Sequence, residues 1–219
     1  MSKIRSPLHH EIIPGPGTLI RWEDIEKRLE DCLSFAKSIH IDIVDGIFAP
    51  HSTWMDPSPF AKYAKKVQLE AHFMTDNPIQ YIKPFANAGF VRFIGQIEKM
   101  PDPTAFVAEG QLWGEVGLAL DGPTPLEDLK VDADDLDVVL LYVGQHAGSS
   151  GGVFVPERLE KIGKLREKDT LLPIEVDGGV NDENISALKD AGVTRFVSTG
   201  FLFNGNPEEQ FHKLQKSIL

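Results

Sequence analysis

The stretch Leu136-Asp137-Val138-Val139-Leu140-Leu141-Tyr142-Val143 decides the fold class of this chain. Apart from one aspartate it is an apolar run of strand length, which indicates a β-strand buried on both faces. Such strands are typical of parallel sheets, because helices cover both sides of those sheets. An apolar strand pattern precedes it over 116–120 and a helical pattern follows over 156–168. The sequence therefore predicts an α/β protein.

Strand-like and helix-like segments alternate along the whole chain. We predict strands over 12–14, 39–44, 67–74, 91–97, 116–120, 136–143, 172–176 and 195–198. We predict helices over 22–37, 57–65, 78–88, 103–111, from 125, and over 156–168, 181–191 and 207–217. Eight strand–helix units of about 27 residues, with no linker between them, predict a single (β/α)8 TIM barrel domain over 1–219. An open doubly wound sheet is the alternative, but Gly15-Pro16-Gly17 is too short for its dinucleotide-binding turn.

Composition excludes several classes of partner. The net charge of −11 argues against nucleic acid and against an anionic membrane surface. No apolar run approaches the roughly 20 residues of a membrane helix. The first 14 residues lack the apolar stretch of a secretory signal, so we expect a cytoplasmic protein.

Four polar side chains stand at the carboxyl ends of predicted strands. His40 and Asp42 share one face of their strand because side chains alternate, His72 lies near the end of the next strand, and Asp177 follows the seventh. Strand ends of a barrel point into one shared site. Two imidazoles and two carboxylates suit one divalent ion, namely Zn, Fe, Mn or Co. The alternative is that all four are hydrogen-bonded core or rim residues.

Glycines gather after the late strands, where barrels of this class bind phosphate. Their backbone N–H groups can approach an anion closely, which an acidic protein needs for a phosphorylated ligand. The predicted phosphate-binding residues are Gly151, Gly152, Gly178, Gly179, Thr199 and Gly200. The alternative is that each glycine only makes a turn. Residues 148–152 also match the G-x-S-x-G pattern of serine hydrolases, but no ordered Asp and His partners accompany the match.

Four segments resemble strand signatures of ribulose-phosphate 3-epimerases. They are residues 40–50 (HIDIVDGIFAP), 71–78 (AHFMTDNP), 117–125 (GLALDGPTP) and 175–181 (EVDGGVN). The resemblance stays in register from about residue 12 to residue 203, so it covers nearly the whole chain. It implies a barrel of the ribulose-phosphate-binding type.

The resemblance also implies a mechanism. His40, Asp42, His72 and Asp177 would carry the metal, and Met74 would contact the substrate. Asp42 and Asp177 would be the acid–base pair, one on each face of a sugar phosphate, so that one removes the C3 proton and the other returns a proton from the opposite side. Inversion requires two proton-transfer groups on opposite faces, and a metal would stabilise the enediolate charge.

Several residues depart from the family pattern. Gly15 stands where a serine is usual, Val44 and Tyr142 replace methionines, and Thr199-Gly200 replaces a glycine–serine pair. The loop over 144–153 is also about two residues longer. These changes fall on the walls and the phosphate end of the expected site, which suggests an altered substrate or weakened activity.

Three further readings remain open. A barrel lyase or decarboxylase would need an Asp-x-Lys pattern, and the matching stretch, residues 42–44, has no lysine. A non-catalytic barrel that binds a metabolite or a protein would tolerate the altered walls. A homo-oligomer is also expected from the family, with Trp54 and Phe60 as candidate interface residues or, equally, core residues.

Overall fold

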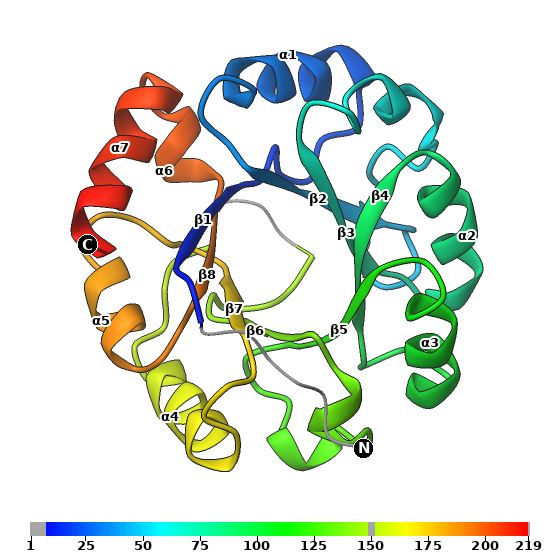
Figure 1. Ribbon diagram of the computed structural model, residues 1–219, viewed down its shortest axis with the longest axis vertical. Helices are drawn as coiled ribbons and strands as arrows, with labels where there is room; N and C mark the ends of the chain where they lie inside the picture. The colour runs from blue at the N-terminus through cyan, green and yellow to red at the C-terminus, as the bar shows by residue number, and fades with distance from the viewer. Residues whose placement is uncertain (1–7, 149–151, 219) are drawn as a thin grey trace.

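A computed structural model describes residues 8–148 and 152–218. Eight parallel strands form one sheet in the order β1-β8-β7-β6-β5-β4-β3-β2, with β1 beside β2 on the nearly closed side of the ring (Figure 1). The Ser38 hydroxyl crosses that side by donating to Glu11 Oε1 at 2.6 Å. The strands are β1 Glu11–Pro14, β2 Ser38–Val44, β3 Gln68–Met74, β4 Phe90–Gln96, β5 Glu115–Leu120, β6 Val138–Tyr142, β7 Ile174–Asp177 and β8 Arg195–Ser198. The predicted (β/α)8 TIM barrel is confirmed.

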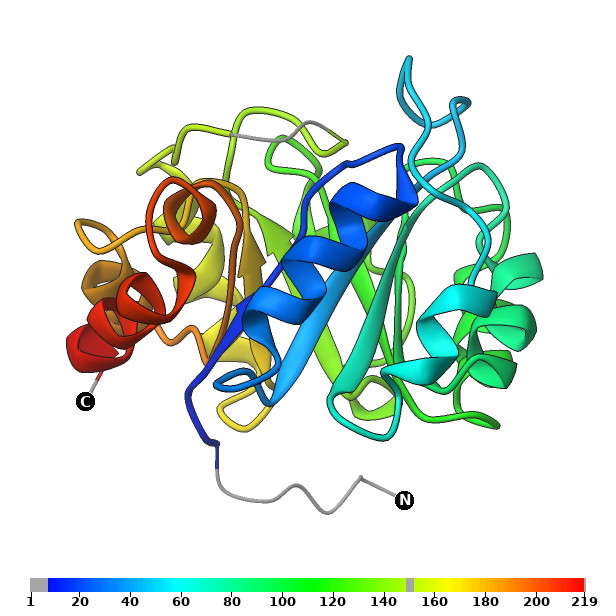
Figure 2. The ribbon, with the colours of Figure 1, turned by 90° about the horizontal axis from the view of Figure 1, so that it is seen from above.

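Helices form the outer ring around the sheet (Figure 1). They are α1 Trp22–Cys32, α2 Ile79–Asn87, α3 Pro103–Gly110, α4 Arg158–Lys168, α5 Ile185–Asp190, α6 Gly200–Phe203 and α7 Pro207–Ile218. Seen from the side, the loops that follow β2 and β6 rise at the end of the barrel opposite the start of β1 (Figure 2). No helix among the described residues is long and apolar enough to cross a membrane.

Both faces of the strands are buried, as the apolar run in β6 predicts. All five residues of β6 are buried. Outward-facing side chains join the helices in the main core, while Ile94, Ala119, Val138 and Leu140 form a separate cluster. Ladder partners face the same side of a sheet. Ile94 pairs with His72, so this second cluster fills the barrel interior.

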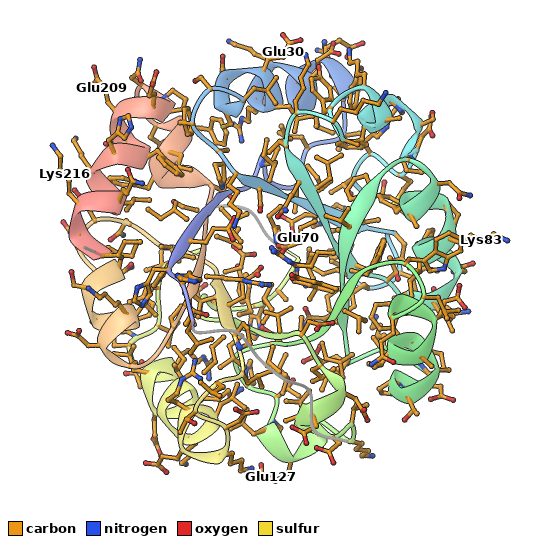
Figure 3. All side chains as sticks on the ribbon, in the orientation of Figure 1. Glu30, Glu70, Lys83, Glu127, Glu209 and Lys216 are labelled. Atoms are coloured by element: carbon orange, nitrogen blue, oxygen red, sulfur yellow. The ribbon has the colours of Figure 1, made fainter. Side chains whose placement is uncertain are left out.

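The strand register also places charged residues inside the barrel. His40 pairs with Glu70, Glu70 with Arg92, and Arg92 with Glu115. These four residues therefore form one inward-facing row, and Figure 3 shows Glu70 within the ring of strands. Burying charge is costly unless the charges are paired, so this row must be satisfied internally.

Some predicted helices are shorter or different. The segment predicted as a helix over 57–65 contains the 3₁₀ helix Ser58–Lys62, with Pro57 and Pro59 at its start, where a missing backbone N–H is tolerated. The helix predicted over 22–37 ends at Cys32, and the segment predicted to be helical from 125 contains two short 3₁₀ helices, Leu126–Asp128 and Ala133–Asp135.

Helices α5 and α6 also differ from the prediction, and the structure shows where the candidate interface residues Trp54 and Phe60 lie. The helix predicted from 181 begins at Ile185, because the Asn181 and Asn184 side chains hydrogen-bond the local backbone in a turn. The short helix α6 was not predicted. Phe60 is fully buried and belongs to the core, and Trp54 is partly buried against that core.

Candidate metal and substrate site

The four predicted ligands meet at the mouth of the barrel. His40 and Asp42 come from β2, His72 from β3 and Asp177 from the end of β7. One ligand atom from each lies within 4.8 Å of all the others. The sequence could place these residues only at strand ends, whereas the structure brings them together around one point.

Distances around Asp42 fit a shared cation. Its Oδ1 lies 3.2 Å from His40 Nε2 and 3.3 Å from His72 Nδ1. Two atoms that each lie about 2.1 Å from one ion are separated by about 3.0 to 3.4 Å at tetrahedral or octahedral angles. The donor set, two imidazoles and two carboxylates, therefore fits one divalent ion in both chemistry and spacing.

The outer nitrogen of each histidine has its own oxygen partner. His40 Nδ1 lies 2.5 Å from Glu70 Oε1, and His72 Nε2 lies 2.8 Å from Gln96 Oε1. A metal-binding histidine usually donates its second N–H to such an oxygen, which fixes the ring and its tautomer. Both rings are thus held with the other nitrogen turned toward Asp42.

A chain of ion pairs, buried at Arg92 and open to solvent at Glu115, supports Glu70. Arg92 donates from Nη1 to Glu70 Oε2 at 2.5 Å and from Nε to Glu115 Oε2 at 2.7 Å. Arg195 Nη2 then donates to the same Glu115 oxygen at 3.0 Å. Burial opposes ionisation of Glu70, but the charge of Arg92 and the contact with His40 hold its pKa below the usual range. Glu70 therefore reaches His40 as a carboxylate.

Glu175 lies beside His40 and Glu70, and these three residues form a second possible ligand group. The ligand atoms of His40, Glu70 and Glu175 also lie within 4.8 Å of one another. The 2.5 Å separation between His40 Nδ1 and Glu70 Oε1 is a hydrogen-bond length and leaves no room for an ion between them. Burial and the charge of Glu70 raise the pKa of Glu175 to about 8. Glu70 and Glu175 therefore contact the outer nitrogen of His40 from the barrel interior.

The two candidate catalytic aspartates have opposite electrostatics. Burial disfavours ionised Asp42, but its contacts with His40 and His72 keep its pKa below the ordinary value. Burial and the charge of Asp42 raise the pKa of Asp177 to about 6. At neutral pH the pair therefore combines a firmly ionised carboxylate with one that takes up a proton more readily.

An open cleft of about 770 Å³ lies beside these aspartates. It is lined by both of them, by Tyr142, and by five of the six predicted phosphate-binding residues, namely Gly152, Gly178, Gly179, Thr199 and Gly200. The sixth, Gly151, lies outside the described residues, as do Ser149 and Ser150 of the G-x-S-x-G match. Met74, the predicted substrate contact, is buried at the end of β3 opposite Val44.

Two glycines of the cleft are required by the backbone. Gly178 and Gly179 have φ of 106° and 82°, in the left-handed region that disfavours other residues. A Cβ on Gly179 would lie 2.5 Å from the carbonyl oxygen of Gly152 and 2.6 Å from the amide nitrogen of Phe154. The loops after β6 and β7 therefore touch through their backbones. The Asn184 side chain holds this contact by donating to Gly179 O at 2.8 Å.

The departures from the family pattern cluster at this cleft. A Cβ on Gly15 would lie 3.1 Å from Thr199 Oγ1, so the threonine side chain partly fills the space above the glycine. Tyr142 pairs with Asp177 in the ladder, and its ring packs about Gly178 and Gly144. Tyr142 and Thr199 therefore shape the wall of the cleft beside the candidate ligands.

Sequence reasoning missed two residues of the site, Arg92 and Gln96. Both lie on β4, where residues 92, 94 and 96 share the inward face. The same alternation that selected His40 and Asp42 marks them as polar residues in an apolar strand. That signal was present in the sequence, but the partners of these residues depend on the strand register.

Comparison with known sequences identifies relatives over most of the chain. A family model described as "Ribulose-phosphate 3 epimerase family" matches residues 21–203. The cytoplasmic isoform of ribulose-phosphate 3-epimerase from Oryza sativa subsp. japonica is 33% identical over 190 residues, covering 82% of each chain. The ribulose-phosphate 3-epimerase of Schizosaccharomyces pombe is 30% identical over 206 residues, covering 90% of each.

Solved structures with a similar fold are more distant in sequence. A 3-keto-L-gulonate-6-phosphate decarboxylase from Vibrio cholerae matches with a TM-score of 0.69 at 15% identity, covering 97% of each chain. A 3-hexulose-6-phosphate synthase matches with a TM-score of 0.67 at 16% identity, covering 95% of this chain and all of the other. At this level of identity the likeness establishes the barrel fold alone.

Proposed function

The chain belongs to the ribulose-phosphate 3-epimerase family of isomerases, and we propose that it inverts C3 of a ketose phosphate. Ribulose 5-phosphate and xylulose 5-phosphate are the first candidates, as the names of its relatives indicate. The observation that carries the proposal is the meeting of two histidines and two aspartates within 4.8 Å beside a glycine-lined cleft.

His40, Asp42, His72 and Asp177 would hold one divalent ion, with Zn, Fe, Mn and Co as candidates. When bound, the ion supplies positive charge against the negative charge that develops on the substrate oxygens. The protein's own part is to hold the two imidazole rings rigidly, through Glu70 and Gln96.

The two aspartates would carry the protons. In one direction Asp42 accepts the C3 proton, the electron pair left on carbon forms an enediolate with the neighbouring carbonyl, and Asp177 delivers a proton to the opposite face of C3. In the other direction the two roles exchange. With a pKa of about 6 in the metal-free protein, Asp177 is the more basic of the two carboxylates and lies nearer the value that suits proton transfer at neutral pH.

The phosphate would lie against the glycine loops. Among the described residues that line the cleft there is no lysine, arginine or histidine, so the anion would have to be held by backbone N–H groups and hydroxyls. Gly151, Gly152, Gly178, Gly179, Thr199 and Gly200 are the proposed contacts. Met74 keeps its proposed role as a substrate contact from the barrel interior.

The test is direct conversion of ribulose 5-phosphate by protein loaded separately with Zn²⁺, Fe²⁺, Mn²⁺ and Co²⁺. We expect xylulose 5-phosphate, and we expect Asp177→Asn to reduce the rate by about 10²- to 10⁴-fold, the usual contribution of a proton-transfer group. Failure with every metal, by folded protein that binds the ion, would remove this substrate.

Tyr142 and Thr199 favour a second candidate with the same chemistry, because their side chains alter the cleft wall. In that case a ketose phosphate of a different chain length would be epimerised faster than ribulose 5-phosphate. A panel of four-, five- and six-carbon ketose phosphates separates the two candidates.

Three expectations about the whole protein belong to the same proposal. We propose a single barrel domain over 1–219 and a cytoplasmic location, the latter supported by the name of the rice relative. Pairing of two copies stays a prediction, and measurement of the molar mass in solution would test it.

A further inference from the structure

Gln96 is a buried polar residue with one contact and no assigned role. It is the last residue of β4 and is fully buried. Its Oε1 lies 2.8 Å from His72 Nε2, while its Nε2 has no hydrogen-bond partner among the described residues. A buried amide with an unpaired end is costly, so this side chain contributes less to stability than its burial alone would indicate.

His72 stands between two acceptors, and its tautomer decides which nitrogen can bind a metal. Its Nδ1 faces Asp42 Oδ1 at 3.3 Å, and its Nε2 faces Gln96. A neutral imidazole carries one proton, and only the other nitrogen offers a lone pair. If the proton were on Nδ1, it would point at Asp42 and block the proposed ligand atom.

We infer that Gln96 is a positioning residue, which accepts the Nε2 proton of His72 when the metal is bound and so keeps the Nδ1 lone pair toward Asp42 and Asp177. The inference rests on the metal site proposed above and gives a role to a residue outside the ligand set. His40 is held in the corresponding way by Glu70, but that carboxylate is anchored by Arg92. Gln96 has no such second anchor, so its effect can be separated from that of the ion-pair network.

Removing the acceptor should weaken metal binding while leaving the fold intact. In metal-free protein the Asp42 carboxylate is a stronger acceptor than an amide oxygen and takes the His72 proton at Nδ1, so Gln96→Leu keeps its thermal stability. A metal on Nδ1 requires the His72 proton to stand on Nε2, where Gln96→Leu offers no acceptor. The apparent dissociation constant should therefore rise by about 10- to 100-fold, as is usual for loss of such a partner.

The matched variants separate this role from a structural one. Gln96→Glu keeps an oxygen acceptor and should bind metal no more weakly than the wild type. Thr75→Val is the control, because the Thr75 hydroxyl is also buried and without a partner, at the end of β3. It should leave metal affinity unchanged. Gln96→Met, which also lacks an amide, serves if the leucine variant does not fold.

The experiment combines two readouts. Long-range ¹H–¹⁵N NMR on Zn²⁺-loaded protein reports whether the Nε2 proton of His72 is hydrogen-bonded, through its chemical shift and its exchange with water. Competition of Zn²⁺ against a chromophoric chelator reports affinity. We expect a hydrogen-bonded Nε2 proton in the wild type and in Gln96→Glu, and a rapidly exchanging Nε2 proton with weakened Zn²⁺ binding in Gln96→Leu.

The possible failures are distinguishable. A rapidly exchanging Nε2 proton in the Zn²⁺-loaded wild type, or equal Zn²⁺ affinity of the wild type and Gln96→Leu, would overturn the inference while the proposed site stands. Loss of affinity in Thr75→Val equal to that in Gln96→Leu would also overturn it. Wild-type protein that binds no Zn²⁺, Mn²⁺ or Co²⁺ would remove the proposed metal site and the inference with it.

Discussion

Replacing Gly179 by alanine tests whether the loops after β6 and β7 are held together by backbone contact. Gly179 has φ of 82°, and a left-handed conformation costs an alanine about 1–2 kcal/mol. The added Cβ would also lie 2.5 Å from Gly152 O and 2.6 Å from Phe154 N, both of which are backbone atoms. Neither can move aside as a flexible side chain could, so the loops must separate.

The expected loss of stability is therefore at least about 1–2 kcal/mol, and for a chain of this size each kcal/mol lowers the melting temperature by about 2–4 °C. Separation of the loops should also displace the backbone N–H groups at the proposed phosphate site and raise KM. Gly200→Ala is the matched control in the same cleft, because a Cβ there meets no atom within 4 Å and its φ is not positive.

Urea and thermal unfolding of both variants, followed by circular dichroism, measure the difference. We expect Gly179→Ala to melt at least about 2–4 °C below the wild type and Gly200→Ala to show no loss. Equal stability of Gly179→Ala and wild type would refute the backbone-contact account. A loss in Gly200→Ala as large as that in Gly179→Ala would do the same.

Three further predictions follow from the buried charges. In protein stripped of metal by a chelator, the pKa of Asp177 is about 6 against an ordinary 3.8. The folded state therefore binds the Asp177 proton more tightly than the unfolded state, and the stability gained from this is complete below pH 3.8 and lost as pH rises through about 6. The wild type should lose stability relative to Asp177→Asn between pH 4 and pH 7. Urea titrations of both proteins across that range check this. A wild type that gains stability relative to Asp177→Asn as pH rises would contradict it. Arg92→Met removes the charge partner of the buried Glu70 carboxylate and should cost about 3–5 kcal/mol, whereas Lys62→Met, at an exposed ion pair with Glu26, should change stability little. Similar losses in the two variants would argue against the buried network. Adding a divalent ion at 100 times its dissociation constant should stabilise the wild type by about 2.7 kcal/mol but His72→Ala much less, which differential scanning calorimetry would show; equal stabilisation of both would place the ion elsewhere.

The strands and their inward faces could be predicted because side chains alternate along a strand with a period of two. That rule put His40 and Asp42 on one face, and position at a strand end put Asp177 beside them. Glycine position likewise predicted the loops that line the cleft, since Gly178 and Gly179 adopt the positive φ values that glycine allows.

The contacts between strands could not be predicted, because they depend on register. Glu70 reaches Arg92 only through the pairing of β3 with β4, which contains a shift between Leu69 and Glu70. Gln96 likewise becomes a partner of His72 only once the barrel closes. The segment predicted to be helical over 57–65 contains only the shorter 3₁₀ helix Ser58–Lys62, whose ends the local sequence pattern does not mark.

The central claim is that this site moves the proton on C3 of a ketose phosphate. The most direct measurement is ¹H NMR of ribulose 5-phosphate incubated in deuterated water with metal-loaded protein. We predict deuterium at C3 in both epimers, with none at C1, and interconversion slowed by about 10²- to 10⁴-fold in Asp177→Asn. Interconversion without deuterium at C3, or incorporation at C1, would contradict the account.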